Sequence, residues 1–162
     1  MKVLSLLLIS LIIVISAATR PSSAIAPDHG SSAFGSGGFN FFNGISTEAF
    51  SYSFDTRSNK NGHATGRAEF DNLTKQTQVV VRVNCLNVNG GTAVISGVVL
   101  HSNDPDLPKS TNVIFGATDF ELFPFFGGDT ITPLFALPTG FDCSDGPPLT
   151  ILPAGGEIEI LP

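Results

Sequence analysis

Three segments of the chain largely alternate apolar and polar side chains, and this pattern constrains the fold more than any other feature. The first is AFSYSFD at 49–55, in which aromatic rings alternate with serines and an aspartate. The second is HATGRAEF at 63–70, and the third is QVVVRVNCL at 78–86. A period of two residues is that of a β-strand with one buried face. The sequence therefore predicts strands packed on a common core.

Turn sequences of a few residues separate these segments. Asn61-Gly62 adopts positive φ at little cost, so we expect the first two strands to form a β-hairpin. Residues 71–74 make the next turn, and 89–91 lead into 92–102, which is dense in β-branched side chains. Gly97 in the middle of that fourth strand indicates a bulge or a sharp bend. These four strands are predicted to form an up-and-down meander.

The C-terminal third is less regular, with short strands expected at 112–118, 132–137 and 157–161. Loops rich in Pro, Gly and Asp separate them, and no stretch after the N-terminal apolar run keeps a helical period. The predicted fold class is therefore all-β. Sequential hairpins favour a small antiparallel meander forming a β-barrel, and a β-sandwich is the alternative.

The N-terminus has the order of a secretory signal: a positive start at Met1-Lys2, an apolar run at 3–15 and small residues at 16–18. The apolar run is shorter than the ~20 residues that a membrane-spanning helix needs. We predict a signal peptide at 1–18, with the cut as late as Ala24, and an uncleaved anchor as the alternative. The mature chain is expected to have no membrane span and to be secreted or extracellular (periplasmic or at the cell surface in a bacterium).

Two further parts follow the predicted signal peptide. Residues 19–47 form a Gly/Ser/Phe-rich arm with four phenylalanines. This arm either packs on the domain as an N-terminal edge or presents an apolar surface to a partner. Residues 48–162 are long enough to bury one core and too short for two, so we predict a single β domain there.

The chain is acidic, with 8 Lys and Arg against 14 Asp and Glu and a formal net charge of −6. Because such a chain repels phosphate backbones, no nucleic-acid partner is expected. Its two cysteines, Cys85 and Cys143, are expected to form one disulfide in an oxidising compartment. A catalytic thiol would need a histidine and a positive environment, and neither stands beside these cysteines in the sequence.

The segment at 81–99 reads V-x-V-x-C-L-x-V-x-G-x-T-A-x-I-S-G-x-V, and a late G-x-D-C ends at Cys143. In these motifs the chain resembles a family of small exported β proteins, mostly bacterial and functionally uncharacterised. The resemblance covers 50–105 and 140–144. It supports the pairing of Cys85 with Cys143, since both cysteines lie in the shared pattern, and it implies no activity.

The densest aromatic cluster comprises Phe120, Phe123, Phe125 and Phe126, in a stretch that Pro124 makes unsuitable for a regular strand. If these rings are buried, they plug the end of a barrel. If they are exposed, they form an apolar patch of the kind that marks a binding surface. This cluster is the predicted site for a small apolar ligand or an extracellular protein.

Other candidate residues carry weaker signals. Asn103, Asp104 and Asp106 offer oxygen ligands that suit Ca²⁺, and the alternative is that they simply build a turn. No cofactor is expected, and the three histidines show no metal-ligand spacing. Asn72 begins an N-x-T acceptor for N-glycosylation, which matters only in a eukaryotic source. His101 with Asp104 is an acid–base pairing without the convergent geometry that catalysis needs.

Three function classes follow from these features. The first is a secreted, non-enzymatic binding module for a small apolar ligand or a protein partner. The second is a structural or surface-associated extracellular protein held by the arm. The third is a β-barrel enzyme of the cyclase or isomerase type. An open cavity would favour the first, a filled core with an exposed arm the second, and a cavity lined by His101 or paired carboxylates the third.

Overall fold

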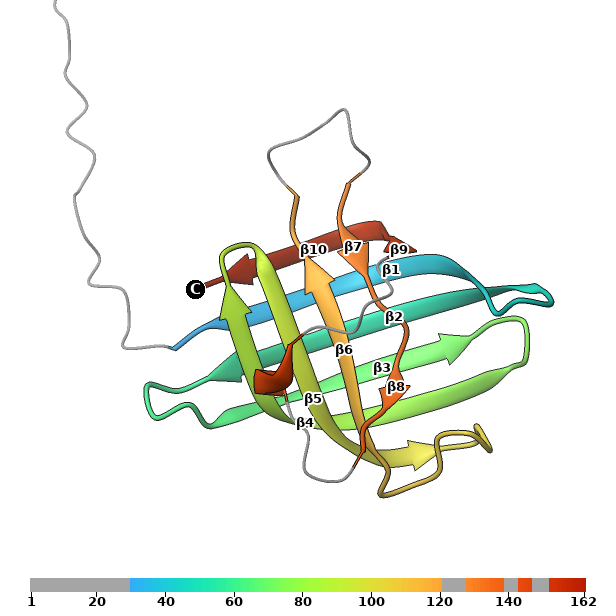
Figure 1. Ribbon diagram of the computed structural model, residues 1–162, viewed down its shortest axis with the longest axis horizontal. Coiled ribbons are helices and arrows are strands. Elements are labelled where there is room, and N and C mark those ends of the chain that lie inside the picture. The colour runs from blue at the N-terminus through green and yellow to red at the C-terminus, as the bar shows by residue number, and fades with distance from the viewer. Residues whose placement is uncertain (1–29, 121–127, 139–142, 147–151) are drawn as a thin grey trace, which may run out of the picture.

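The computed structural model describes residues 30–120, 128–138, 143–146 and 152–162, and this part of the chain is all-β (Figure 1). The elements in chain order are β1 (Ser32–Phe42), β2 (Thr47–Ser58), β3 (Ala64–Asn72), β4 (Thr77–Asn89), β5 (Thr92–Ser102), β6 (Asn112–Thr118), β7 (Thr130–Ile131), β8 (Phe135–Ala136), the 3-10 helix η1 (Cys143–Asp145), β9 (Leu152–Pro153) and β10 (Gly155–Leu161). The predicted signal peptide at 1–18 lies outside the described residues. Within the described ranges, no helix is long and apolar enough to cross a membrane.

The strands form one antiparallel sheet in the order β10-β1-β2-β3-β4-β5-β6-β7-β9, with β8 also paired to β6. From β1 to β6 the spatial order equals the chain order, which confirms the predicted meander. The strand expected at 112–118 coincides with β6. The strand expected at 132–137 is instead reduced to β8, and the one expected at 157–161 lies within β10.

The sheet is not closed into a barrel, so that part of the prediction is wrong. β9 and β10 stand at opposite ends of the sheet order and do not pair, although only Ala154 separates them in the chain. The strands β7, β8 and β9 have two residues each, with Pro133 between β7 and β8 and Pro153 in β9. Proline has no N–H to donate to a ladder, so long pairing cannot develop at this edge. Nor does the sheet divide into the two sheets of a sandwich.

The stretch predicted as a Gly/Ser/Phe-rich arm contains β1, which pairs with β2 on one side and β10 on the other. The sheet therefore begins at Ser32 rather than at residue 48. Glycine in this strand has a packing role: a Cβ on Gly37 would overlap the carbonyl oxygen of Gly155 in β10. Of the phenylalanines in β1, Phe39 is buried in the core and Phe42 is exposed. The glycines that suggest a linker thus allow two strands to approach closely.

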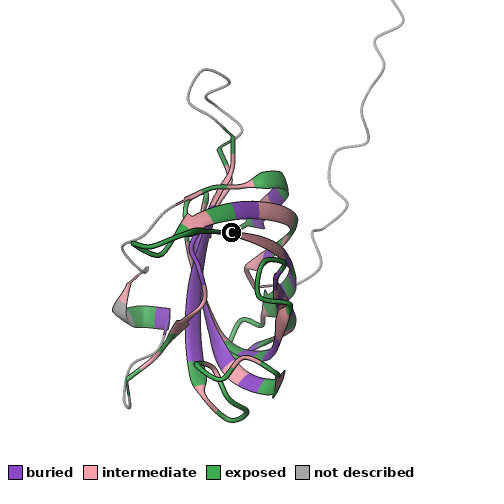
Figure 2. Cartoon of the chain, turned by 90° about the vertical axis from the view of Figure 1, so that its right-hand side faces the viewer, coloured by how far each residue is buried: buried purple, intermediate pink, exposed green. Residues whose placement is uncertain are grey.

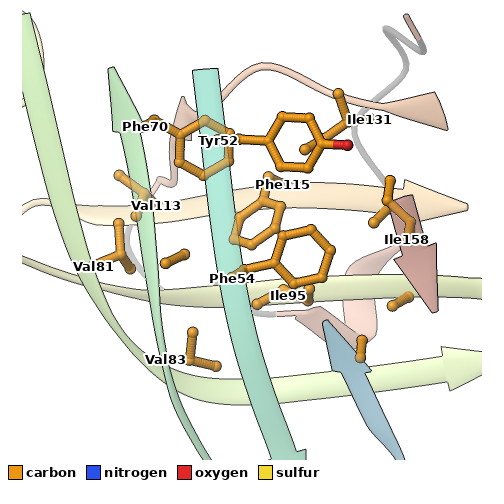
Figure 3. Close-up of a cluster of buried hydrophobic side chains, with 14 of the residues drawn as sticks. Tyr52, Phe54, Phe70, Val81, Val83, Ile95, Val113, Phe115, Ile131 and Ile158 are labelled. Atoms are coloured by element: carbon orange, nitrogen blue, oxygen red, sulfur yellow. The ribbon is translucent and has the colours of Figure 1, made fainter. Parts of the chain in front are cut away.

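The sheet curls so that the inner face of its first half lies opposite β6, with the buried positions turned inward (Figure 2). Phe115 of β6 contacts Phe54 of β2 and Phe70 of β3 edge-on, with ring centroids 5.5 Å and 5.0 Å apart. Tyr52 points into the same interior (Figure 3). Burial, followed by the negative charge of Asp129, raises the pKa of Tyr52 to about 12, so its hydroxyl stays protonated.

The long strands β4 and β5 are irregular where the sequence predicts it. Their pairing shifts register between Val80 and Val81 and again between Val83 and Cys85. The second shift lies beside Gly97, which pairs with Val83. An extra residue on one strand bends the pair and increases its twist. The predicted irregularity at Gly97 is confirmed.

Cys85 in β4 and Cys143 in η1 are joined by a disulfide, as predicted, with Cα atoms 5.8 Å apart. Cys143 packs with Val94 and Ile114 in a small second cluster. These two side chains alternate with core residues along β5 and β6, so they lie on the face turned away from the main core. The bond thus ties η1 to the outer face of the sheet. It is typical of an oxidising compartment.

Candidate functional site

The connections β1–β2, β3–β4 and β5–β6 lie at one end of the sheet, on the right in Figure 1. At this end the structure has a pocket with a volume of about 330 Å³. Its lining comes from all three connections, from the adjoining strand ends and from residues 133–136 between β7 and the end of β8. The volume is within the range of small-molecule sites, about 300–1,000 Å³.

The walls of the pocket are mostly apolar. Phe50, Phe70 and Val79 reach it from β2, β3 and β4, at the inward positions of the alternating pattern. Leu107 and Leu134 close it from two loops. These are the positions that the period of two assigns to the core face. At this end of the sheet they face a pocket as well as the core.

A buried carboxylate, that of Glu48 at the start of β2, organises the polar part of the lining. Its side chain is 5% exposed and pairs with the ammonium group of Lys75, whose Nζ lies 2.9 Å from Oε1. The amide nitrogens of Asn43 and Asn72 also donate to this carboxylate, one to each oxygen. Glu48 therefore links the β1–β2 turn to the end of β3 and to the β3–β4 turn.

The two asparagines are held in place by the turns that they build. Asn43 Oδ1 accepts hydrogen bonds from the backbone N–H groups of Ile45 and Ser46, at 2.9 Å and 3.0 Å. Asn72 Oδ1 accepts in the same way from Thr74 and Lys75, at 3.1 Å and 2.9 Å. Such side-chain-to-backbone bonds are what make asparagine a turn residue. With each oxygen engaged in its own turn, each amide nitrogen points at Glu48.

These partners determine the ionisation of the pair. The hydrogen bond from Lys75 is the largest influence and lowers the pKa of Glu48, burial opposes it, and the bonds from Asn72 and Asn43 lower the pKa further. The net direction is downward. The same contact with Glu48 raises the pKa of Lys75. Both groups are therefore charged at neutral pH, and the pair is a fixed feature of the pocket.

The predicted calcium ligands lie at the rim of this pocket and act as turn residues. Asn103 Oδ1 accepts a hydrogen bond from the backbone N–H of Gln78 in β4. Asp104 Oδ1 accepts from the backbone N–H of Asp106 at 2.9 Å. Asp104 and Asp106 line the pocket and Asn103 does not. Among the described residues, no group of three or more His, Cys, Asp or Glu side chains is arranged to hold a metal ion.

The predicted aromatic site lies elsewhere. Phe120 follows β6 and is 45% exposed, and its backbone N–H donates to Asp129 Oδ1 at 3.1 Å. Its neighbour Asp119 donates a backbone hydrogen bond to the carbonyl of Gly91 in the β4–β5 turn, so Phe120 is at the end of the sheet opposite the pocket. The other members of the cluster lie outside the described residues: Phe123, Phe125 and Phe126.

Two further candidates are placed by the fold. Asn72, the predicted glycosylation acceptor, is 4% exposed, and its amide nitrogen donates to Glu48. The folded chain therefore does not present this nitrogen to solvent. His101 is exposed on β5 and does not line the pocket that contains Asp104, so the structure does not bring the two into one site.

Sequence reasoning missed the residues that shape this site, chiefly Glu48, Asn43 and Lys75. Glu48 reads as a domain boundary and Asn43 as part of an arm, and Lys75 falls between the predicted turn at 71–74 and the strand at 78–86. The one available signal was local: asparagines placed where strands meet turns. That signal predicts turns. It does not predict that two of the asparagines, Asn43 and Asn72, donate to the same carboxylate, which lies 24 residues from Asn72 in the chain.

No protein-family model, curated protein or solved structure matches the chain. The resemblance to small exported bacterial proteins therefore stays a prediction, and the pocket itself is the basis for a function.

Proposed function

We propose that the chain is an exported, non-enzymatic binding module that takes a small apolar ligand into the pocket at the β1–β2 end of the sheet. The observation that carries the proposal is the pocket's composition: a cavity of about 330 Å³ has an apolar wall that includes inward-facing Phe50, Phe70 and Val79, and a fixed polar rim. Binding sites for small molecules combine these two features, apolar surface for affinity and a few placed polar groups for orientation.

The packing around the wall supports a preformed site. Phe50 stacks on Phe39 with ring centroids 5.0 Å apart and planes within 3° of parallel. Phe70 is held from the other side by the edge contact with Phe115. The Glu48 network ties the two turns above these rings together. A pocket with walls fixed in this way binds without a large ordering cost.

The same geometry favours this function over the two alternatives. An enzyme that used the buried carboxylate of the pocket as an acid or base would need it free to exchange a proton, and Glu48 is engaged with three donors. A structural role would need the arm to extend from the domain. Its β1 segment is instead a strand of the sheet, paired between β10 and β2, so this alternative loses its main support. Export is proposed from the N-terminal signal pattern together with the disulfide.

Titration with the neutral fluorescent probe N-phenyl-1-naphthylamine tests the proposal. Leu107→Trp adds bulk at the pocket wall, and Leu100→Trp places the same side chain on an exposed position of β5 outside the pocket. We expect the wild type and L100W to bind the probe and L107W to bind it at least about tenfold more weakly. Absence of probe binding by the wild type, or equal binding by a folded L107W, contradicts the proposal. Circular dichroism of both variants reports the fold.

A further inference from the structure

The pocket lining contains more acidic than basic side chains. Three carboxylates, those of Glu48, Asp104 and Asp106, stand against the single ammonium group of Lys75. Lys109 belongs to the same β5–β6 loop as Asp104 and Asp106 and does not line the pocket. The rim therefore carries an excess of two negative charges over one apolar cavity.

The hydrogen-bond donors of the rim are directed at Glu48. Lys75, Asn43 and Asn72 all converge on its carboxylate. A ligand carboxylate at this end would have to share these donors with Glu48 and would face its negative charge. The pocket therefore disfavours an anionic head group on grounds of charge.

The carboxylates of Asp104 and Asp106, the other charged groups of the rim, still have lone pairs available to a ligand. Asp104 accepts from the Asp106 backbone through Oδ1 and from Thr77 Oγ1 through Oδ2, the second at a long 3.5 Å. Asp106 is exposed at the pocket edge. Neither carboxylate has a cation within ion-pair distance among the described side chains, although both act on Lys75 from farther away and add to the effect of Glu48 in raising its pKa. Both have the charge and the lone pairs to take an ammonium group.

We propose that the pocket prefers apolar ligands that carry a cationic amine, with the apolar body against Phe50, Phe70 and Val79 and the ammonium group at Asp104 and Asp106. This inference rests on the proposed function and names the ligand class of the same site. The acidic net charge of the whole chain acts in the same direction, because it draws cations toward the surface.

A matched ligand series separates the head group from the apolar body. Naphthalen-1-ylmethylamine, naphthalen-1-ylmethanol and naphthalene-1-carboxylate share one ring system and are cationic, neutral and anionic at neutral pH. Each is titrated as a competitor of N-phenyl-1-naphthylamine at low ionic strength. We expect the amine to bind about tenfold more tightly than the alcohol, the effect of two partly screened ion pairs, and the carboxylate to bind most weakly.

Two double variants locate the charges responsible. Asp104→Asn with Asp106→Asn removes both rim charges and keeps the Oδ1 acceptor of the turn. Asp55→Asn with Glu157→Gln removes two exposed charges that do not line the pocket. We expect the rim variant to bind amine and alcohol equally, and the control variant to keep the tenfold preference. Raising the salt concentration with the wild type should reduce the preference without weakening the alcohol, which tests the inference even if the rim variant fails to fold.

The outcomes distinguish the two proposals. If the alcohol or the carboxylate displaces the probe as well as the amine does, the charge preference is refuted and the apolar site stands. If the control variant loses the preference together with the rim variant, the effect comes from the net charge of the chain and the assignment to Asp104 and Asp106 fails. If neither the probe nor any of the three ligands binds, the proposed function itself is refuted.

Discussion

Among the described residues Phe115 is the largest side chain that is completely buried, and replacing it with alanine tests how the two halves of the sheet are held together. Its ring contacts Phe54 and Phe70 across the interior, at centroid distances of 5.5 Å and 5.0 Å. Phe115→Ala removes both contacts and leaves a cavity between β6 and the facing strands. Substitutions of this kind cost about 3–5 kcal/mol. Since small domains have about 5–15 kcal/mol in total, the loss is a large part of the free energy of unfolding.

Equilibrium unfolding in urea, followed by circular dichroism, measures this loss. Phe42→Ala is the matched control, because Phe42 is 62% exposed and its removal should change the free energy of unfolding by less than about 0.5 kcal/mol. A loss below about 1 kcal/mol for F115A, with an unchanged dependence on urea, would show that the halves do not meet at this ring. Phe70 also lines the pocket, so F115A should weaken probe binding too.

Two further predictions concern the disulfide and the buried carboxylate. Reduction of Cys85–Cys143, which are 58 residues apart, should lower the free energy of unfolding by up to about 4 kcal/mol; urea curves with and without reductant that agree within about 1 kcal/mol would contradict this. The lowered pKa of Glu48 means that its ionised form stabilises the fold above the ordinary glutamate value of 4.5 and that this contribution disappears as the pH falls through the lowered pKa. Glu48→Gln should therefore be less stable than the wild type at neutral pH and approach it in acid, whereas a gap that is independent of pH would refute the linkage.

The central strands could be predicted because their pattern is local. In β2, β3 and β4 most of the alternate positions that turn inward are apolar, and the structure buries positions such as Tyr52, Ala68 and Val81. A half-buried antiparallel strand imposes this period whatever its neighbours are. The turns between them carry Asn and Gly for equally local reasons, so the meander follows from the sequence order alone.

β1 and the edges of the sheet depend on partners that are distant in the sequence. Gly37 reads as linker because the reason for its small size, the carbonyl of Gly155, is far along the chain. The sheet would close only if β7 and β9 were longer, and prolines beside or within these strands keep them short. An alternating pattern describes one strand and does not show which strands pair at the edges. For these reasons composition assigns the residues of β1 to an arm, and the run of sequential hairpins predicts a closed barrel.

The candidate site likewise has one part that the sequence predicts and one part that it does not. The apolar wall of the pocket could be predicted, since Phe50, Phe70 and Val79 occupy the inward positions of their strands. The role of Glu48 could not, because its three partners come from two turns and reach it only when the strands are paired. The aromatic cluster is predicted as a site from its density in the sequence. Density does not show at which end of a sheet a residue lies, and Phe120 lies opposite the pocket.

A rule of topology links the strands that could be predicted to the site that was missed. In an antiparallel meander every second connection falls at the same end of the sheet. The turn at 71–74 and the loop after the strand at 92–102 therefore share one end, and the segment that follows β6 begins at the other. This rule brings Lys75 and the acidic pair of the β5–β6 loop together and separates them from Phe120. The strands supply the apolar depth of the pocket and the connections supply its charge, so head-group preference should change with the β5–β6 loop while affinity for the apolar body follows the rings.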